Sequence, residues 1–224
     1  RRNFAWFLNC KGIMKLNRER SFLANFINPF CEVYVMKSPK RRQIAVLGSS
    51  QIICTPKAYK LAYEVGKEIA KQGMITLTGG GGGVMEAALK GAKAAGGLTL
   101  AIIPWGDTSR VNKYADVVVA TGMMWSRDSI NLNSCDGAIL VGGGAGTVNE
   151  ASYGYILDKP MVAIKSSGGM AEQLAGHYFD KRHTEKVIPV HTPKEAVEKL
   201  LSIIKHRLHE PAQSARRKAK FKLM

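Results

Sequence analysis

The sequence predicts an α/β fold: a single Rossmann-like, doubly wound parallel sheet flanked by helices, with basic N- and C-terminal extensions. Short continuous apolar runs alternate with stretches in which apolar residues recur at helical spacing, as a parallel sheet covered on both faces requires. Glycine or hydroxyl residues follow three of these runs. We therefore divide the chain into an extension over 1–42, a central domain over 43–204, and the end of the last helix with a basic tail over 205–224.

The first half of the domain begins with IAVLG (44–48), a short apolar run that predicts a buried strand. Residues 56–72 predict a helix, because Pro56 lies near its first turn and Gly73 provides a stop signal. The pattern then predicts a strand at 74–78, a helix with a small-residue face at 84–97, and a strand at 98–104.

The second half repeats this alternation. It predicts strands at 116–121, 137–141, 161–164 and 187–190, and helices at 126–135, 146–157 and 194–208. Right-handed crossovers place the carboxyl ends of parallel strands on one edge of the sheet. The turns at 48–50, 78–83 and 142–147 should therefore meet there and form a ligand site.

The formal net charge of +16 is concentrated at the two ends of the chain. Residues 1–42 carry +8 and residues 205–224 carry +6, which leaves +2 for the central domain. Basic ends attract polyanions without specificity, so this charge does not indicate a nucleic-acid-binding domain. The first 42 residues leave three interpretations open: a targeting presequence, an extension that packs on the domain, or a stretch upstream of a natural start at Met36.

Cysteine and histidine spacing argues against a metal site and a disulfide framework. The four cysteines are scattered without CxxC spacing, and the five histidines form no HExxH motif. This usage fits a reducing cytoplasm, and no run of 18 or more apolar residues predicts a membrane span. We expect a cytoplasmic protein with no metal and no membrane partner.

The two common nucleotide-binding motifs do not fit the glycine turns. Neither glycine run continues into the Gly-Lys-Ser/Thr of a P-loop, and the first turn reads GSSQII rather than GxGxxG. Two glycine loops that each open a helix can still present several backbone N–H donors to a phosphate. The alternative is that the glycines only allow close packing of helix on strand. The residues predicted to bind the ligand are Gly48, Ser49, Ser50, Gly79, Gly80, Gly81, Gly82, Gly83, Met123, Gly143, Gly144, Ala145, Gly146 and Thr147.

Two charged residues stand beside these loops. Arg127 opens one predicted helix and Glu150 lies in the first turns of the next, so one helix and one strand separate them and return the chain to the same sheet edge. Each residue also has a simpler interpretation, as a surface ion pair or as an acid favoured near a helix N-terminus. Met123 lies a few residues before Arg127, where it either lines a ligand pocket or fills the core.

The segments TGGGGGVMEAALKGAKAAGG, TGMMWSRDSIN and GGGAGTVNE, in this order, resemble the motifs of the LOG (lonely guy) superfamily. The resemblance covers roughly residues 43–204. Within the superfamily, these segments are most similar to the molybdenum-cofactor carrier branch and its uncharacterised prokaryotic relatives. Members often carry the label lysine decarboxylase, an activity that the resemblance does not imply. It implies instead hydrolysis of the N-glycosidic bond of a nucleoside 5′-monophosphate, with Glu150 and Arg127 at the positions of the catalytic pair.

The carrier branch implies a second function, which is binding of molybdopterin cofactor without hydrolysis. Gly142 stands where the enzymes have proline, and Asn149 replaces the first of two glutamates that are common there. Either a nucleoside monophosphate or molybdenum cofactor is therefore the expected ligand, and hydrolysis requires no cofactor. The resemblance also implies a homodimer or homotetramer, for which the small-residue faces of the helices after the two glycine loops are candidate contacts.

Overall fold

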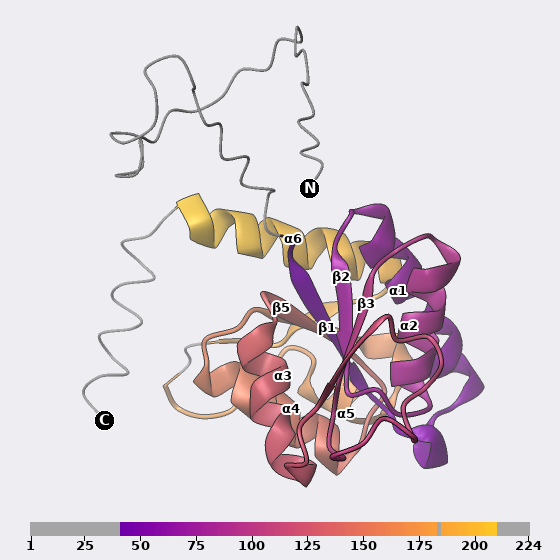
Figure 1. The fold of residues 1–224 in the computed structure, drawn as a ribbon. Coiled ribbons are helices and arrows are strands. Elements are labelled where there is room, and N and C mark those ends of the chain that lie inside the picture. Colours follow the sequence, from indigo (N-terminus) through magenta and orange to yellow (C-terminus); the bar gives the residue numbers. More distant parts are fainter. Residues whose placement is uncertain (1–40, 183–184, 210–224) are drawn as a thin grey trace, which may run out of the picture. The chain divides into compact units, whose positions relative to one another are not determined.

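The computed structural model describes residues 41–182 and 185–209, and these form one seven-stranded sheet with helices on both faces (Figure 1). The strands are β1 (Gln43–Gly48), β2 (Ile75–Thr78), β3 (Thr99–Ile103), β4 (Val117–Ala120), β5 (Gly137–Val141), β6 (Met161–Ile164) and β7 (Ile188–Val190). All neighbouring strands pair in parallel, in the order β4-β3-β2-β1-β5-β6-β7. The predicted fold class is confirmed. The predicted extensions lie almost wholly outside the described residues.

The strand order places a topological switch point in the middle of the sheet. The chain starts at β1, moves outward through β2, β3 and β4, and then returns to β5 on the other side of β1. The loops that follow β1 and β5 therefore leave in opposite directions, and in open α/β sheets this arrangement generally forms a ligand-binding crevice at the carboxyl ends of the two strands. The GSS turn and the second glycine turn both lie at this crevice.

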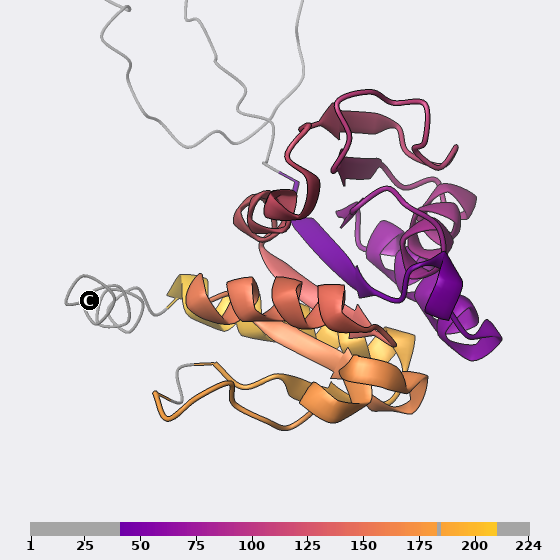
Figure 2. The same ribbon diagram turned by 90° about the horizontal axis from the view of Figure 1, so that it is seen from below.

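Six α-helices connect the described strands and cover the sheet. They are α1 (Pro56–Lys71), α2 (Val84–Ala94), α3 (Asp128–Ser134), α4 (Ala145–Ile156), α5 (Gly169–Leu174) and α6 (Pro193–His209). Three short 3₁₀ turns precede or follow them: η2 (Gln51–Ile53), η3 (Met124–Arg127) and η4 (Lys165–Ser167). Helices α1, α2 and α6 pack on one face, and α3, α4 and α5 pack on the other (Figures 1 and 2).

The central strands supply both cores through the alternation of their side chains. In β1, Ile44 and Val46 face α1, while Ala45 and Leu47 face the opposite core. All four side chains are buried. The sequence of β1 is therefore a continuous apolar run, although its residues alternate between two cores.

Helices α1 and α2 approach closely because each carries a glycine at their contact. A Cβ atom on Gly66 would lie 1.9 Å from the Ala88 carbonyl oxygen, and one on Gly91 would lie 1.9 Å from that of Tyr63. Gly154 of α4 similarly packs against Met161. The small-residue faces that were candidates for contact with a second copy are therefore used inside the chain, and that expectation was wrong.

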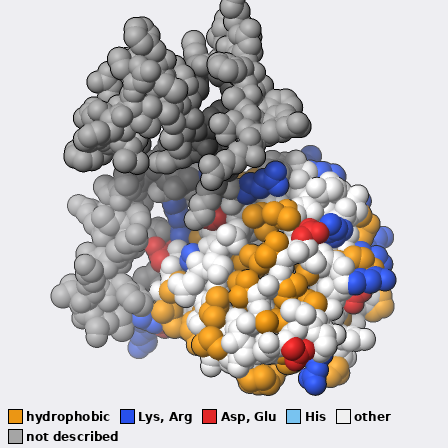
Figure 3. Space-filling view, in the orientation of Figure 1, with side chains coloured by type: hydrophobic (Ala, Val, Ile, Leu, Met, Phe, Trp, Pro, Cys, Tyr) orange, Lys and Arg blue, Asp and Glu red, His pale blue; other side chains and the backbone are white. Residues whose placement is uncertain are grey.

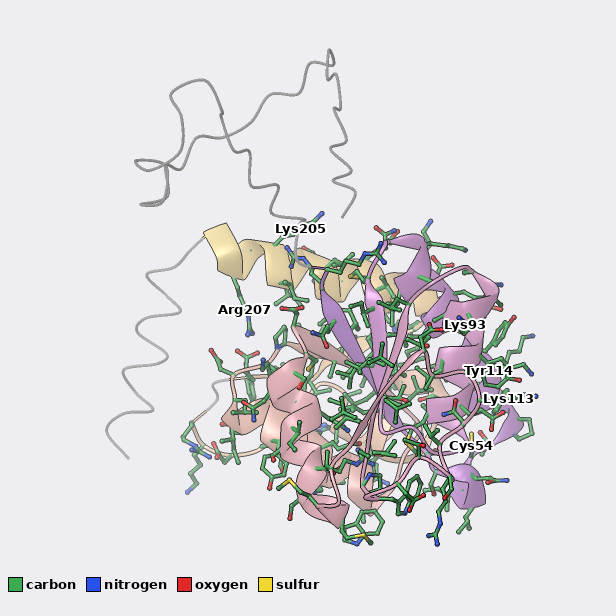
Figure 4. All side chains as sticks on the ribbon, in the orientation of Figure 1. Cys54, Lys93, Lys113, Tyr114, Lys205 and Arg207 are labelled. Atoms are coloured by element: carbon green, nitrogen blue, oxygen red, sulfur yellow. The ribbon has the colours of Figure 1, made fainter. Side chains whose placement is uncertain are left out.

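Among the described elements, no helix covers the β3–β4 half of one sheet face. The connection from β3 to β4 contains no helix, and its residues pack with α2 on one side of the sheet, where Lys93 pairs with Asp116 at 2.5 Å and Tyr114 lies under Lys113 (Figure 4). On the opposite side, Val117 and Val119 of β4 stay 47% and 43% exposed. Hydrophobic side chains form a band across the face that Figure 1 turns toward the viewer (Figure 3).

Candidate functional site

The first glycine loop, residues 79–83, lies between the end of β2 and the start of α2. Gly80 and Gly83 have φ values of +74° and +73°, which favour glycine. The Asn112 side chain donates to the carbonyl oxygens of Gly80 and Gly81, both at 3.0 Å. This contact comes from the β3–β4 connection, and it holds the loop in one conformation.

The second glycine loop, residues 142–144, connects β5 to α4. Gly142 and Gly143 have φ values of +62° and +102°. The N–H of Gly142 donates to Ser167 Oγ and that of Gly143 donates to Ser49 Oγ, each at 2.7 Å. The proline of the enzyme motif can adopt only a φ near −65°. The positive φ of residue 142 therefore fits glycine and excludes proline.

Ser49 joins the two glycine loops. Its hydroxyl accepts the Gly143 N–H at 2.7 Å, and its carbonyl oxygen accepts the Val84 N–H at 2.9 Å. Ser49 is 3% exposed and makes these hydrogen bonds from a buried position, whereas the neighbouring Ser50 is exposed. A Cβ on Gly48 would lie 2.0 Å from the Val141 carbonyl oxygen, so this glycine keeps β1 close to the end of β5.

The start of α4 offers backbone N–H groups at the crevice. Gly144 is the N-cap and makes no side-chain cap, so the N–H groups of Ala145, Gly146 and Thr147 have no partner inside the helix. The Gly143 N–H, which the glycine pattern assigned to the ligand, is already used by Ser49. Thr147 is 2% exposed, and its Oγ1 has no hydrogen-bond partner within the described part of the chain.

The structure brings Arg127 and Glu150 together across the space between η3 and α4. Arg127 Nη1 lies 3.3 Å from Glu150 Oε1, and the side chains are only 8% and 12% exposed. The guanidinium also rests on the first glycine loop, because a Cβ on Gly79 would lie 2.5 Å from Arg127 Nη2. Arg127 thus contacts the end of β2 and the helix that follows β5 at the same time.

Three further polar side chains complete this cluster. The Arg127 Nη1 atom lies 3.1 Å from Asp128 Oδ1, and Asn131 Nδ2 donates to Glu150 Oε1 at 3.2 Å. Asn149 Nδ2 donates to Asp128 Oδ2 at 2.7 Å. We call these five residues, Arg127, Asp128, Asn131, Asn149 and Glu150, the carboxylate cluster.

The surroundings of Glu150 raise the pKa of its carboxyl group toward neutrality. Burial is the largest cause and raises the pKa of Glu150 from 4.5 to about 7. The Arg127 charge lowers this pKa, and the Asp128 charge raises it. A carboxyl whose pKa lies near neutrality can accept and release a proton under physiological conditions, which is a property of catalytic acids and bases.

An exposed apolar segment precedes Arg127. Met123, Met124 and Trp125 are 48%, 53% and 72% exposed, so Met123 does not fill the core. Met124 has a φ of +49°, an uncommon conformation for a residue other than glycine. The structure divides the predicted helix 126–135 into η3 and α3, and this change of helix type positions Arg127 at their junction.

A pocket of about 270 Å³ adjoins the first glycine loop at Gly83. Gln51, Tyr59, Gly83 and Glu86 are among its lining residues, and the Tyr59 hydroxyl donates to Glu86 Oε1 at 3.2 Å.

Within the described ranges, no group of three or more His, Cys, Asp or Glu residues is arranged to hold a metal ion. None of the helices in those ranges is long and apolar enough to cross a membrane.

The sequence analysis singled out Arg127 and Glu150, which the structure brings together, but it did not identify the residues that support Glu150 and the glycine loops. Asn112, Asn131 and Ser167 act through side-chain hydrogen bonds to residues 19 to 32 positions away in sequence. An asparagine or serine in a loop or on a helix carries no local signal for such a contact. Asn149 did have a signal, because it departs from the motif.

The sequence model of the SLOG cluster4 family matches residues 41–197 of this chain. The cytokinin riboside 5′-monophosphate phosphoribohydrolase of Mycobacterium tuberculosis is 34% identical over 155 residues, which cover 62% of this chain and 82% of that protein. The molybdenum cofactor binding protein from the phototrophic bacterium Rippkaea orientalis has a similar structure, with a TM-score of 0.65 and 34% identity over 75% of this chain and 99% of that one. The molybdenum cofactor carrier protein MCP from Chlamydomonas reinhardtii gives a TM-score of 0.63 and 32% identity, over 73% and 99% of the two chains.

Proposed function

Since this chain belongs to the SLOG cluster4 family, we propose that it binds a phosphorylated, nucleotide-like small molecule at the crevice between β1 and β5 and hydrolyses it. The reaction that we propose is cleavage of the N-glycosidic bond of a nucleoside 5′-monophosphate. The observation that carries this proposal is the buried contact between Arg127 and Glu150 beside both glycine loops. The similarity to a phosphoribohydrolase supports it.

The proposed position of the phosphate is the N-terminus of α4. The N–H groups of Ala145, Gly146 and Thr147, which have no partner inside the helix, and the positive end of the helix favour an anion there. Glu150 lies three residues further along the helix than Thr147, which is a rise of about 5 Å. The carboxyl group would therefore meet the sugar rather than the phosphate, and the two negative groups stay apart.

The chemistry follows from this placement. Cleavage of the bond between C1′ and the base develops positive charge on the ribose, and a nearby carboxylate stabilises such charge. Water adds its oxygen to C1′ and gives ribose 5-phosphate, while its proton goes to the base that leaves. A carboxyl with a pKa of about 7 can take the proton from water and release it. Arg127 keeps its charge and orients the Glu150 carboxyl, and no cofactor is required.

Incubation of the protein with AMP tests this proposal, with free adenine measured by chromatography. We expect the wild type to release adenine and Glu150→Gln to release at least 100-fold less. Glu198→Gln is the matched control, because Glu198 is an exposed residue on α6 with a 61% exposed side chain. Equal release by the wild type and by Glu150→Gln, or no release by either, would refute the hydrolase.

Carrier function is the second candidate, and the two molybdenum cofactor proteins of similar structure favour it. The same crevice would then hold the phosphate of the pterin cofactor as cargo. We expect a carrier to show a higher melting temperature with molybdenum cofactor and no release of base from AMP. A melting temperature that does not change at saturating cofactor would exclude this function.

We further propose that the protein acts as a homodimer or homotetramer in the cytoplasm. The uncovered face of β3 and β4 supports self-association, because Val117 and Val119 are exposed there beside the half-buried Leu100 and carry no charge. An apolar patch can meet its own copy about a two-fold axis without repulsion. The free thiols of Cys54 and Cys135 are consistent with a reducing compartment.

A further inference from the structure

The carboxylate cluster contains two carboxyl groups and a single guanidinium. Arg127 Nη1 contacts both, at 3.1 Å from Asp128 Oδ1 and 3.3 Å from Glu150 Oε1. The side chains of all three residues are at most 12% exposed. Because one cation cannot fully compensate two buried anions, the cluster has a place for one proton, and its neighbours decide which carboxyl carries it.

The hydrogen-bond donors divide the two carboxyl groups. Asp128 Oδ1 forms an ion pair with Arg127 Nη1 at 3.1 Å, and Asp128 Oδ2 accepts a hydrogen bond from Asn149 Nδ2 at 2.7 Å. Both donors to Glu150, Arg127 Nη1 and Asn131 Nδ2, reach the same oxygen, Oε1, and they do so at 3.3 and 3.2 Å. Among the described residues no donor contacts Glu150 Oε2.

We propose that Asn149 is a positioning residue: it fixes Asp128 as the permanent counter-ion of Arg127 and thereby leaves Glu150 as the carboxyl that takes up and releases a proton. A donor that bonds to a carboxylate favours its charged form, so the short contact from Asn149 favours ionised Asp128. Two neighbouring carboxyl groups in different surroundings then perform different tasks. This inference deepens the proposed function and rests on it for its chemical meaning.

The charged groups that face Glu150 are few. Arg127 approaches from η3 and Asp128 from the start of α3, and α3 also contributes the neutral Asn131. The high pKa of Glu150 agrees with the proposed division, since burial and the Asp128 charge both raise it.

A titration of the full-length protein tests the inference directly. The side-chain carboxyl carbons of Asp and Glu are labelled with ¹³C, and the Glu150 and Asp128 signals are identified by their loss in Glu150→Gln and Asp128→Asn. In Asn149→Leu, Asp128 loses its hydrogen-bond donor, and we expect the Glu150 midpoint to fall by about one pH unit. Asp128→Asn removes the competing charge and should also lower the Glu150 midpoint.

Asn133→Leu is the matched control. Asn133 lies exposed on α3, and its side chain donates to the Ser129 carbonyl oxygen at 2.8 Å, so its replacement should leave the Glu150 midpoint unchanged. A Glu150 midpoint that stays the same or rises in Asn149→Leu would overturn the proposal. If the leucine variant does not fold, a Glu150 midpoint that fails to fall in Asp128→Asn would overturn it instead. The titration needs no turnover: absence of adenine release from AMP would refute the hydrolase and leave this result standing.

Discussion

The guanidinium of Arg127 lies directly against Gly79. A Cβ atom on Gly79 would come within 2.5 Å of Nη2 and 2.7 Å of Nη1, and the glycine has no unusual φ that would explain its presence. The absence of a side chain at position 79 therefore makes room for the arginine. This contact connects the first glycine loop to the residue that holds Glu150.

Gly79→Ala tests this relationship. The new methyl group should push the guanidinium away from Glu150, and a displacement of about 1 Å in a catalytic group costs roughly 100-fold in rate. We expect such a loss in kcat/KM for AMP, with a melting temperature close to that of the wild type, since the end of an arginine side chain can move. Gly106→Ala is the control, because its Cβ would meet only the Gly122 Cα at 4.0 Å. Wild-type activity in Gly79→Ala would contradict the assigned role of Arg127.

Glu150 should make the stability of the protein depend on pH. Burial raises its pKa from 4.5 to about 7, so the folded protein binds this proton more tightly than the unfolded chain does. The contribution of Glu150 to the free energy of unfolding is fully present below pH 4.5. It is lost as the pH rises through 7, and the loss amounts to roughly 3 kcal/mol. Urea unfolding between pH 5 and pH 8 should therefore show a smaller loss of stability for Glu150→Gln than for the wild type.

Glu185 serves as an internal reference in that experiment. Burial also raises its pKa to about 7, and the Arg207 charge opposes this shift. Glu185 is present in both proteins, so its contribution cancels in their difference. Parallel stability curves for the wild type and Glu150→Gln would show that Glu150 titrates normally.

Gly66 and Gly91 should resist replacement although both lie in helices. Alanine is favoured over glycine in a helix interior by about 1 kcal/mol. Here a Cβ at either position would lie 1.9 Å from a carbonyl oxygen of the opposite helix, so α1 and α2 would have to separate. We expect Gly66→Ala and Gly91→Ala to lower the free energy of unfolding by about 1–3 kcal/mol.

Gly146→Ala gives the matched comparison for these two variants. Gly146 also lies in a helix, but a Cβ there would meet nothing within 4 Å. Chemical denaturation should show this variant to be as stable as the wild type or more stable. If Gly66→Ala and Gly91→Ala behaved in the same way, the close packing of α1 on α2 would be wrong.

The uncovered face of β4 predicts a change in oligomeric state. Val119→Glu places a charge on this face, and in a dimer related by a two-fold axis it would bring two like charges together or bury them. We expect sedimentation to show an oligomer for the wild type and a monomer for this variant. Ile52→Glu is the control, since Ile52 is 95% exposed on η2. A wild-type monomer would remove self-association from the proposal.

The sequence by itself determined that the sheet is parallel, that its strands alternate with helices, and where both glycine loops lie along the chain. These features depend on local patterns: buried strands read as apolar runs, and glycine marks the turns where φ is positive. The spacing of Arg127 and Glu150 also indicated that one helix and one strand would return the chain to the same edge, and the two side chains lie 3.3 Å apart.

Only the tertiary structure decided what holds this pair and which surfaces remain free. The Ser49 hydroxyl reaches a glycine 94 residues away, and the Asn149 amide reaches Asp128 on another helix. The small-residue face of α2 is covered by α1, while β4 lacks a helix on one side. Such contacts depend on where each side chain points after the elements have packed, and hydrophobic periodicity along the chain carries no information about that.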